Sequence, residues 1–145
     1  MQDRDESDAA TRGLSLDERL SGPAAFLPVF ESPTFSFGSV QGGGDEFPWF
    51  ALSADGARFV DLSYRLGWVV PGFDWIAWID TKDARQLVSD SRAVEHATAE
   101  DLEHLLTAHI RQDRFSEGHL GAMFESGHLS AIVRRADALL REIDT

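Results

Sequence analysis

Apolar residues recur every three or four positions along the C-terminal third of the chain, a spacing that predicts amphipathic helices. One stripe consists of Leu102, Leu105, Leu106 and Ile110. The last stripe consists of Leu129, Ile132, Val133, Ala136, Leu139, Leu140 and Ile143. Together with the short segment between them, these stripes predict helices over about residues 99–113, 116–126 and 129–143, stacked antiparallel with very short connections.

The first half of the chain predicts shorter helices and one extended region. Ser15 and Glu18 have the spacing of a capping box, and Ser53 is a favourable N-cap. Between them, Phe35 and Phe37 alternate with small polar residues, and three glycines separate them from the aromatic segment FPWFAL. Such alternation is typical of a half-buried strand. The expected fold class is therefore mainly α, a compact domain of five or six helices with a short β-hairpin or extended aromatic segment near residues 34–52.

Two prolines and one apolar stretch refine this picture. Pro23 is placed to begin a second short helix, and Pro28 to kink or end it. The most apolar stretch is GWVVPGFDWIAWI, in which Asp74 is placed to cap a helix that continues through Val88. Because aromatic side chains bury large apolar areas, we expect this stretch to lie in the core.

Length and composition indicate a single domain. The chain has 145 residues, of which 43% are hydrophobic, enough for a core without covalent cross-links. Residues 1–13 are polar and aperiodic, so we expect a disordered acidic tail followed by one helical domain over residues 14–145. The chain shows neither a signal peptide nor an apolar run near the roughly 20 residues of a membrane-spanning helix. We therefore expect a cytoplasmic location.

Charge and residue usage argue against several functions. The net charge of −12 repels phosphate groups, so neither nucleic acid nor an anionic membrane is an expected partner. The absence of cysteine excludes disulfides, thiolate catalysis and cysteine-ligated zinc. Neither G-x-S-x-G nor S-x-x-K occurs, and no catalytic residue is assigned.

The stretch SEGHLGAMFESGH, residues 116–128, concentrates the remaining candidate chemistry. Much of it follows the rules of helix boundaries. Ser116 is placed as an N-cap, Phe115 and Leu120 as a hydrophobic staple, and Gly127 as the left-handed residue that ends the helix. Gly118 is not explained in this way, because glycine inside a helix costs about 1 kcal/mol relative to alanine. A glycine at such a position suggests that another group approaches closely.

The segments RFSEGHL and FESGHL, together with GWVVPGFDW, resemble the core pattern of a family of small bacterial proteins that is classed as a domain of unknown function. The resemblance extends from about Phe50 to Arg135. It implies a bacterial, cytosolic protein, and it supplies no catalytic residues because the family has no assigned activity.

The candidate ligand site is defined by charged side chains near these motifs. It consists of Arg111, Arg114, Glu117, Gly118, His119, Glu125 and His128. Arginines form bidentate hydrogen bonds with carboxylates and phosphates, so a small anionic ligand is one interpretation. The other is structural, since Arg114 and Glu117 are spaced to pair with each other.

Metal and acid–base sites are less well supported by the pattern. The H-E-x-x-H motif is absent, and His104 and His109 are five positions apart, which places them about 140° from each other around a helix. Neither a metal nor a cofactor is therefore predicted. His109 lies on an apolar helix face, where a hydrogen-bonded core histidine is favoured over an acid–base group.

These observations favour a non-enzymatic binding or interaction module, with a protein partner or self-association into a homodimer. The alternative is a small-molecule, anion-binding or enzymatic site around Arg114, Glu117, His119 and His128.

Overall fold

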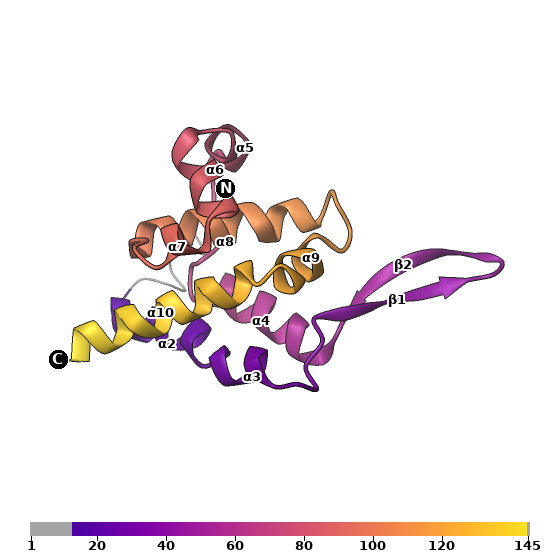
Figure 1. Cartoon of the computed structure of the whole chain (residues 1–145), viewed down its shortest axis with the longest axis horizontal. Helices are drawn as coiled ribbons and strands as arrows, with labels where there is room; N and C mark the ends of the chain where they lie inside the picture. Colours follow the sequence, from indigo (N-terminus) through magenta and orange to yellow (C-terminus); the bar gives the residue numbers. More distant parts are fainter. Residues whose placement is uncertain (1–12, 145) are drawn as a thin grey trace.

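The computed structural model describes residues 13–144 as a helical body from which one β-hairpin projects (Figure 1). The predicted disordered tail thus lies outside the described residues, apart from Gly13. The helices are α2 (Leu16–Ala24), α3 (Leu27–Glu31), α4 (Ala54–Arg65), α5 (Trp75–Ile79), α6 (Lys82–Ser89), α7 (Ser91–Val94), α8 (Ala99–Asp113), α9 (His119–Glu125) and α10 (His128–Asp144). The hairpin consists of β1 (Gly38–Gly43) and β2 (Glu46–Leu52). The predicted mainly α fold is confirmed, and the hairpin lies within the expected residues 34–52.

Several helices begin at the predicted caps. Ser15 and Glu18 form the expected capping box at the start of α2. The Ser53 hydroxyl accepts a hydrogen bond from an amide in the first turn of α4. Thr98 and Asp101 form a second capping box at the start of α8. Each cap satisfies a backbone amide that the helix itself leaves without a partner.

The two prolines occupy different helix positions from those expected. Pro23 lies inside α2, near its end, and does not begin a new helix. The next helix, α3, begins at Leu27 and has Pro28 in its first turn. Proline is well tolerated there, because a first-turn amide has no partner within its own helix.

The apolar stretch around residues 68–79 is only partly in the core. Trp68 is fully buried, as predicted, but α5 contains no buried residue and Ile76 is exposed. The expected continuous helix is divided because Thr81 caps a separate helix, α6, with its side chain. Within the described residues, no helix combines the length and the apolar character needed to cross a membrane.

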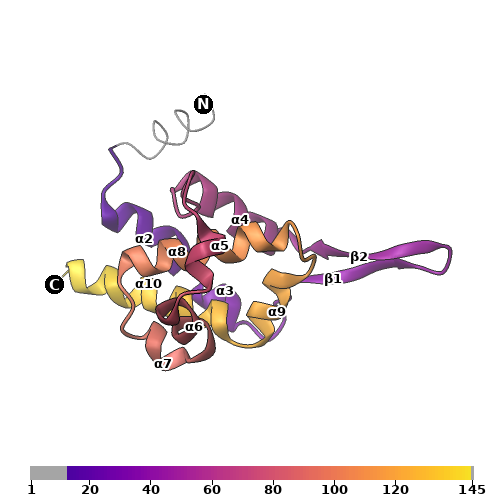
Figure 2. The ribbon, with the colours of Figure 1, turned by 90° about the horizontal axis from the view of Figure 1, so that it is seen from above.

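The C-terminal helix α10 is central to the packing. It lies mainly along α2, near the other end of the sequence, and also contacts α3, α7, α8 and α9. Helices α8 and α10 run in roughly opposite directions (Figures 1 and 2). The expected C-terminal stack is therefore completed by the N-terminal helix α2, a long-range contact that the periodicity of α10 did not specify.

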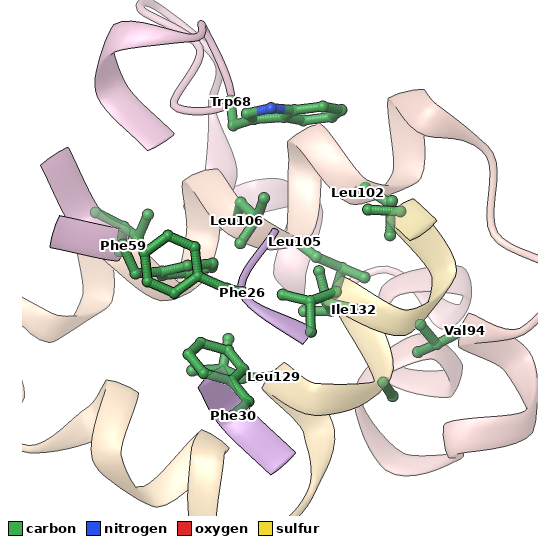
Figure 3. Packing of buried hydrophobic residues seen from close by; sticks show 14 of the residues in the cluster. Phe26, Phe30, Phe59, Trp68, Val94, Leu102, Leu105, Leu106, Leu129 and Ile132 are labelled. Atoms are coloured by element: carbon green, nitrogen blue, oxygen red, sulfur yellow. The ribbon is translucent and has the colours of Figure 1, made fainter. Parts of the chain in front are cut away.

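The core joins aromatic side chains from the first half of the chain to aliphatic ones from α8 and α10 (Figure 3). The rings of Phe26, Phe30 and Phe59 contact one another, and the Phe59 centroid lies 5.3 Å from that of Phe26 and 5.2 Å from that of Phe30. Phe37 and the half-buried Phe124 extend this cluster to α9. Phe37 therefore lies in the core, just before the strand that its alternation with Phe35 predicted.

The hairpin leaves the body as a two-stranded antiparallel arm (Figures 1 and 2). In its register, Val40 lies opposite Phe50 and Gln41 opposite Trp49, with a bulge before Gly43. Five of the six residues of β1 are exposed. A two-stranded hairpin is marginally stable by itself, so its attachment to the body matters.

Candidate functional site

Three histidines from three helices form a continuous hydrogen-bonded chain inside the protein. His109 lies in α8, and His119 and His128 are the first residues of α9 and α10. The Nδ1 atom of His109 lies 3.0 Å from Nε2 of His119. The Nε2 atom of His109 lies 3.0 Å from Nε2 of His128. His109 thus links the two histidines that the sequence placed among the candidate site residues.

The surroundings of the chain favour one set of tautomers. A neutral imidazole has one N–H group, so His109 donates on one side and accepts on the other. Nδ1 of His128 is buried and has no hydrogen-bond partner among the described residues. Because a buried N–H without an acceptor is costly, we assign the His128 proton to Nε2. His128 then donates to His109, His109 donates to His119, and the proton of His119 lies on Nδ1.

Burial keeps the three imidazoles uncharged at neutral pH. It lowers the pKa of His109 well below its usual value, and the neighbouring His128 and His119 lower it further. Burial also lowers the pKa of His128 to about 4, with an additional effect of His119. The pKa of His119 is lowered by burial, against the opposing effect of the Asp113 carboxylate. A neutral hydrogen-bonded chain avoids placing charge in the interior.

The arrangement of nitrogens does not form a metal site. His109 uses its two ring nitrogens toward two different neighbours, so the three rings do not direct lone pairs to a common point. In the part of the chain that the structure describes, no group of three or more His, Asp or Glu residues could hold a metal ion. His104 lies apart from the cluster, stacked on Phe73 with ring centroids 4.1 Å apart.

The arginine and the acid expected beside these histidines have other partners. Arg114 donates to the Tyr64 hydroxyl at 2.8 Å, and its guanidinium lies 5.6 Å from the centre of the Tyr64 ring. Glu117 accepts a hydrogen bond from the Phe50 amide at 2.9 Å. Both side chains are therefore engaged in contacts between distant parts of the chain.

The other candidate residues are also separated from one another. Nε of Arg111 is buried and has no hydrogen-bond partner among the described residues. Glu125 is exposed on α9. Of the predicted side chains, the structure links His119 with His128 through His109 and distributes the charged ones over separate positions.

The two glycines near the start of α9 have different explanations: Gly118 has a left-handed backbone at the helix start, and Gly121 lies against the hairpin. The helix begins at His119, after Gly118, so the expected N-cap at Ser116 is wrong. Gly118 has a φ angle of +87°, which glycine adopts readily, and a Cβ atom there would lie 3.7 Å from the Phe50 ring. At Gly121, a Cβ atom would lie 2.8 Å from Cζ of Phe50. Small residues on α9 therefore let the base of the hairpin pack directly against this helix.

This contact predicts that Gly121→Val destabilises the protein by about 1–3 kcal/mol, because the larger side chain must displace the Phe50 ring. Ala122→Val is the matched control, since Ala122 lies in the same helix but is exposed. We expect its effect to be within about 0.5 kcal/mol. Urea unfolding of both variants measures the difference, and equal stabilities would contradict the packing of Phe50 on Gly121.

Beyond its base, the hairpin exposes apolar side chains. The exposed fractions are 68% for Val40, 94% for Phe47 and 50% for Trp49. A shallow groove of about 310 Å³ lies where the arm meets α9, lined by Val40, Pro48, Trp49, Phe50, Glu117 and Gly118. Trp49 pairs with Gln41 and therefore lies on the opposite face of the hairpin from Val40, so each face of the arm exposes an apolar side chain.

Two residues that organise this region, His109 and Phe50, were not among the candidate site residues predicted from the sequence. His109 was expected to be a hydrogen-bonded core residue, and it is also the centre of the histidine chain. Phe50 belonged to an aromatic segment without an assigned contact, although its ring fills the space that a side chain at Gly121 would need. The position of His109 on an apolar face, one helix before two further histidines, was the available signal.

Comparison with known proteins places the chain in a family without an assigned activity. The model of a family of unknown function, DUF6508, matches residues 15–142, so the chain belongs to this family. The match includes the N-terminal helices, which the sequence resemblance did not cover. No curated protein and no solved structure matches the chain.

Proposed function

We propose that this member of DUF6508 is a protein-interaction module whose hairpin binds a second copy of the same chain. The main support for this proposal is the projecting arm, on which Val40, Phe47 and Trp49 are exposed to solvent. Burying apolar surface contributes roughly 25 cal/mol per Å², and aromatic residues often dominate interface energies. The arm thus offers the side chains from which interfaces commonly gain their affinity.

The way the arm is held supports this role. Its base is fixed by the Phe50 ring on Gly121 and by the hydrogen bond between the Phe50 amide and Glu117. Its outer part has no such support from the described helices. A rigid base reduces the conformational entropy that binding must overcome, and this favours affinity.

The distribution of charge limits where two copies of the chain can meet. The chain has a net charge of −12, so acidic surfaces of two copies repel each other. The exposed apolar residues of the arm are flanked in β1 by uncharged residues, and the arm's acids, Asp45 and Glu46, lie at its turn and the start of β2. The central residues of β1 can therefore meet those of a second copy without opposing carboxylates. Closed twofold dimers are also the commonest homo-oligomers.

A second candidate, a small-molecule or enzymatic site, is motivated by the histidine chain. His119 is half-buried, and the chain leads from it to the buried His128, an arrangement through which a proton can move. We rank this candidate second, because Arg114 and Glu117 are engaged with Tyr64 and Phe50. The carboxylate of Glu117 also disfavours an anionic ligand in the nearby groove.

The proposal predicts that the triple variant Val40→Ser, Phe47→Ser and Trp49→Ser weakens self-association at least about 100-fold, because interfaces rely on a few apolar anchors. Sedimentation equilibrium of the full chain measures the dissociation constant. The matched control is Ile76→Ser with Phe115→Ser, which removes exposed apolar residues outside the hairpin. The proposal fails if the control weakens association as much as the hairpin variant does.

A further inference from the structure

We infer that the outer edge of β1 pairs antiparallel with the same edge of a second copy, around a twofold axis at Val40, to form a four-stranded sheet. This inference rests on the proposed function and specifies its contact. It follows from a difference between the two edges of the hairpin, because the outer edge of β2 is closed whereas that of β1 is open.

The direction of the backbone groups follows from two hydrogen bonds. The Phe50 amide donates to Glu117, outside the hairpin, so Phe50 and its partner Val40 form a pair that is not hydrogen-bonded within the ladder. Residues at alternate positions bond to each other across the two segments: the Ser53 amide donates to the Phe37 carbonyl at 2.9 Å. Both observations place the N–H and C=O groups of Val40 and Gly38 on the outer edge of β1.

Two features close the outer edge of β2. Pro48 is two residues before Phe50, so its backbone nitrogen also faces the outer edge, but proline carries no N–H group. The outward N–H of Phe50 is already occupied by the Glu117 carboxylate. Proline and charged side chains at a sheet edge are common devices that prevent pairing with another strand.

The outer edge of β1 lacks these devices. Its sequence, GSVQGG, contains neither a charged residue nor a proline. Two features limit the length of this edge: the exposed Ser36 hydroxyl donates to the Gly38 carbonyl at 3.1 Å, and the backbone leaves strand conformation at Gly42, where φ is +78°. An open, uncharged edge is a template for a further strand.

A twofold axis at Val40 would place an identical strand beside this edge, where its backbone groups find hydrogen-bond partners. The two Val40 residues donate to each other's carbonyls, and their exposed side chains meet on one face of the new sheet. Because the strands are antiparallel, residue 38 lies opposite residue 42 of the partner, and the partner's turn approaches residues 34–36. A groove of about 440 Å³ lies there, lined by Val29, Ser32, Thr34, Phe35, Ser36, Ser53, Ala54 and Asp55. The partner's turn carries Asp45 and this groove includes Asp55, so the proposed contact is confined to the strand edge around Val40.

Substitutions at Val40 separate the backbone contact from the side-chain contact. Val40→Pro removes an N–H group that the hairpin itself does not use, and proline is tolerated at such edge positions. We expect it to weaken dimerisation about 30-fold, because two hydrogen bonds across the axis are lost. Val40→Thr keeps the amide and the branched shape, and we expect a change within about threefold.

Hydrogen exchange of the wild-type chain is a test that does not depend on the folding of a variant. With dimerisation, the Val40 amide should become protected as the protein concentration rises through the dissociation constant. The Gln41 amide, which faces β2, should be protected at every concentration and is the internal control.

The outcomes distinguish the contact from the dimer itself. If the chain dimerises but Val40→Pro and Val40 exchange show no effect, the edge contact is wrong and the proposed function remains. If the chain is monomeric at all concentrations, both are wrong. If Val40 is protected on dimerisation and Val40→Pro weakens it while Val40→Thr does not, the edge contact is established.

Discussion

The protein should lose stability as the pH falls from 6.5 toward 4, because the unfolded chain protonates histidines that burial keeps neutral in the folded protein. The folded-state pKa of His128 is about 4, against an ordinary value of 6.5. The unfolded chain therefore binds a proton that the folded chain excludes, and stability decreases as the pH is lowered. The contribution of His128 is complete above pH 6.5 and is lost progressively down to pH 4. The difference between these two pKa values corresponds to about 3 kcal/mol in the free energy of unfolding.

Chemical unfolding at a series of pH values between 7.5 and 5 measures this effect while most carboxylates stay charged. His109, whose pKa is also lowered by burial, adds to the loss. His128→Gln is the diagnostic variant, because an amide can still bond to His109 and does not titrate in this range. We expect a shallower decrease for this variant. A wild-type stability independent of pH, or an equal decrease in both proteins, would contradict the neutral histidine chain.

Trp68→Ala should destabilise the folded protein by about 3–5 kcal/mol, the usual range for removing a fully buried large aromatic side chain. The indole N–H donates to the Arg19 carbonyl at 2.9 Å, and the Arg19 guanidinium lies 4.6 Å from the ring centre. On the other side, the Thr107 hydroxyl donates to the Trp68 carbonyl at 3.0 Å and accepts from the Val70 amide. Trp68, which lies just after α4, thus connects this segment with both α2 and α8.

The matched control for this prediction is Trp75→Ala, which removes the same side chain from a partly exposed position in α5. We expect a loss of about 1 kcal/mol, because less apolar surface returns to water. Thermal and urea unfolding of both variants give the comparison. Similar losses in the two variants would contradict the different burial of the two tryptophans.

Features that depend on neighbouring residues were predictable from the sequence. The caps at Ser15, Ser53 and Asp74 were correctly identified, because a cap is a hydrogen bond between residues two or three positions apart. Gly127 was also correctly interpreted as a left-handed helix end, with a φ angle of +87°. The mainly α class followed from the same local patterns.

Features that depend on residues distant in sequence could not be derived in this way. The contact that requires a glycine at position 121 is one of these, because its neighbour Phe50 is 71 residues earlier in the chain. The link between His119 and His128 requires His109, whose position is fixed by packing of α8 and not by a local motif. The pattern of apolar residues also does not determine which of them are buried. Phe37 is in the core, whereas Phe47 is exposed.

The central claim, that the hairpin joins two copies of the chain, is tested most directly by the mass in solution. Light scattering of the purified chain should give a mass that rises with concentration from 16.1 kDa toward twice that value. The hairpin variant with three serines should keep the monomer mass over the same concentrations. A wild-type mass of 16.1 kDa at every concentration, up to about millimolar, would contradict the account.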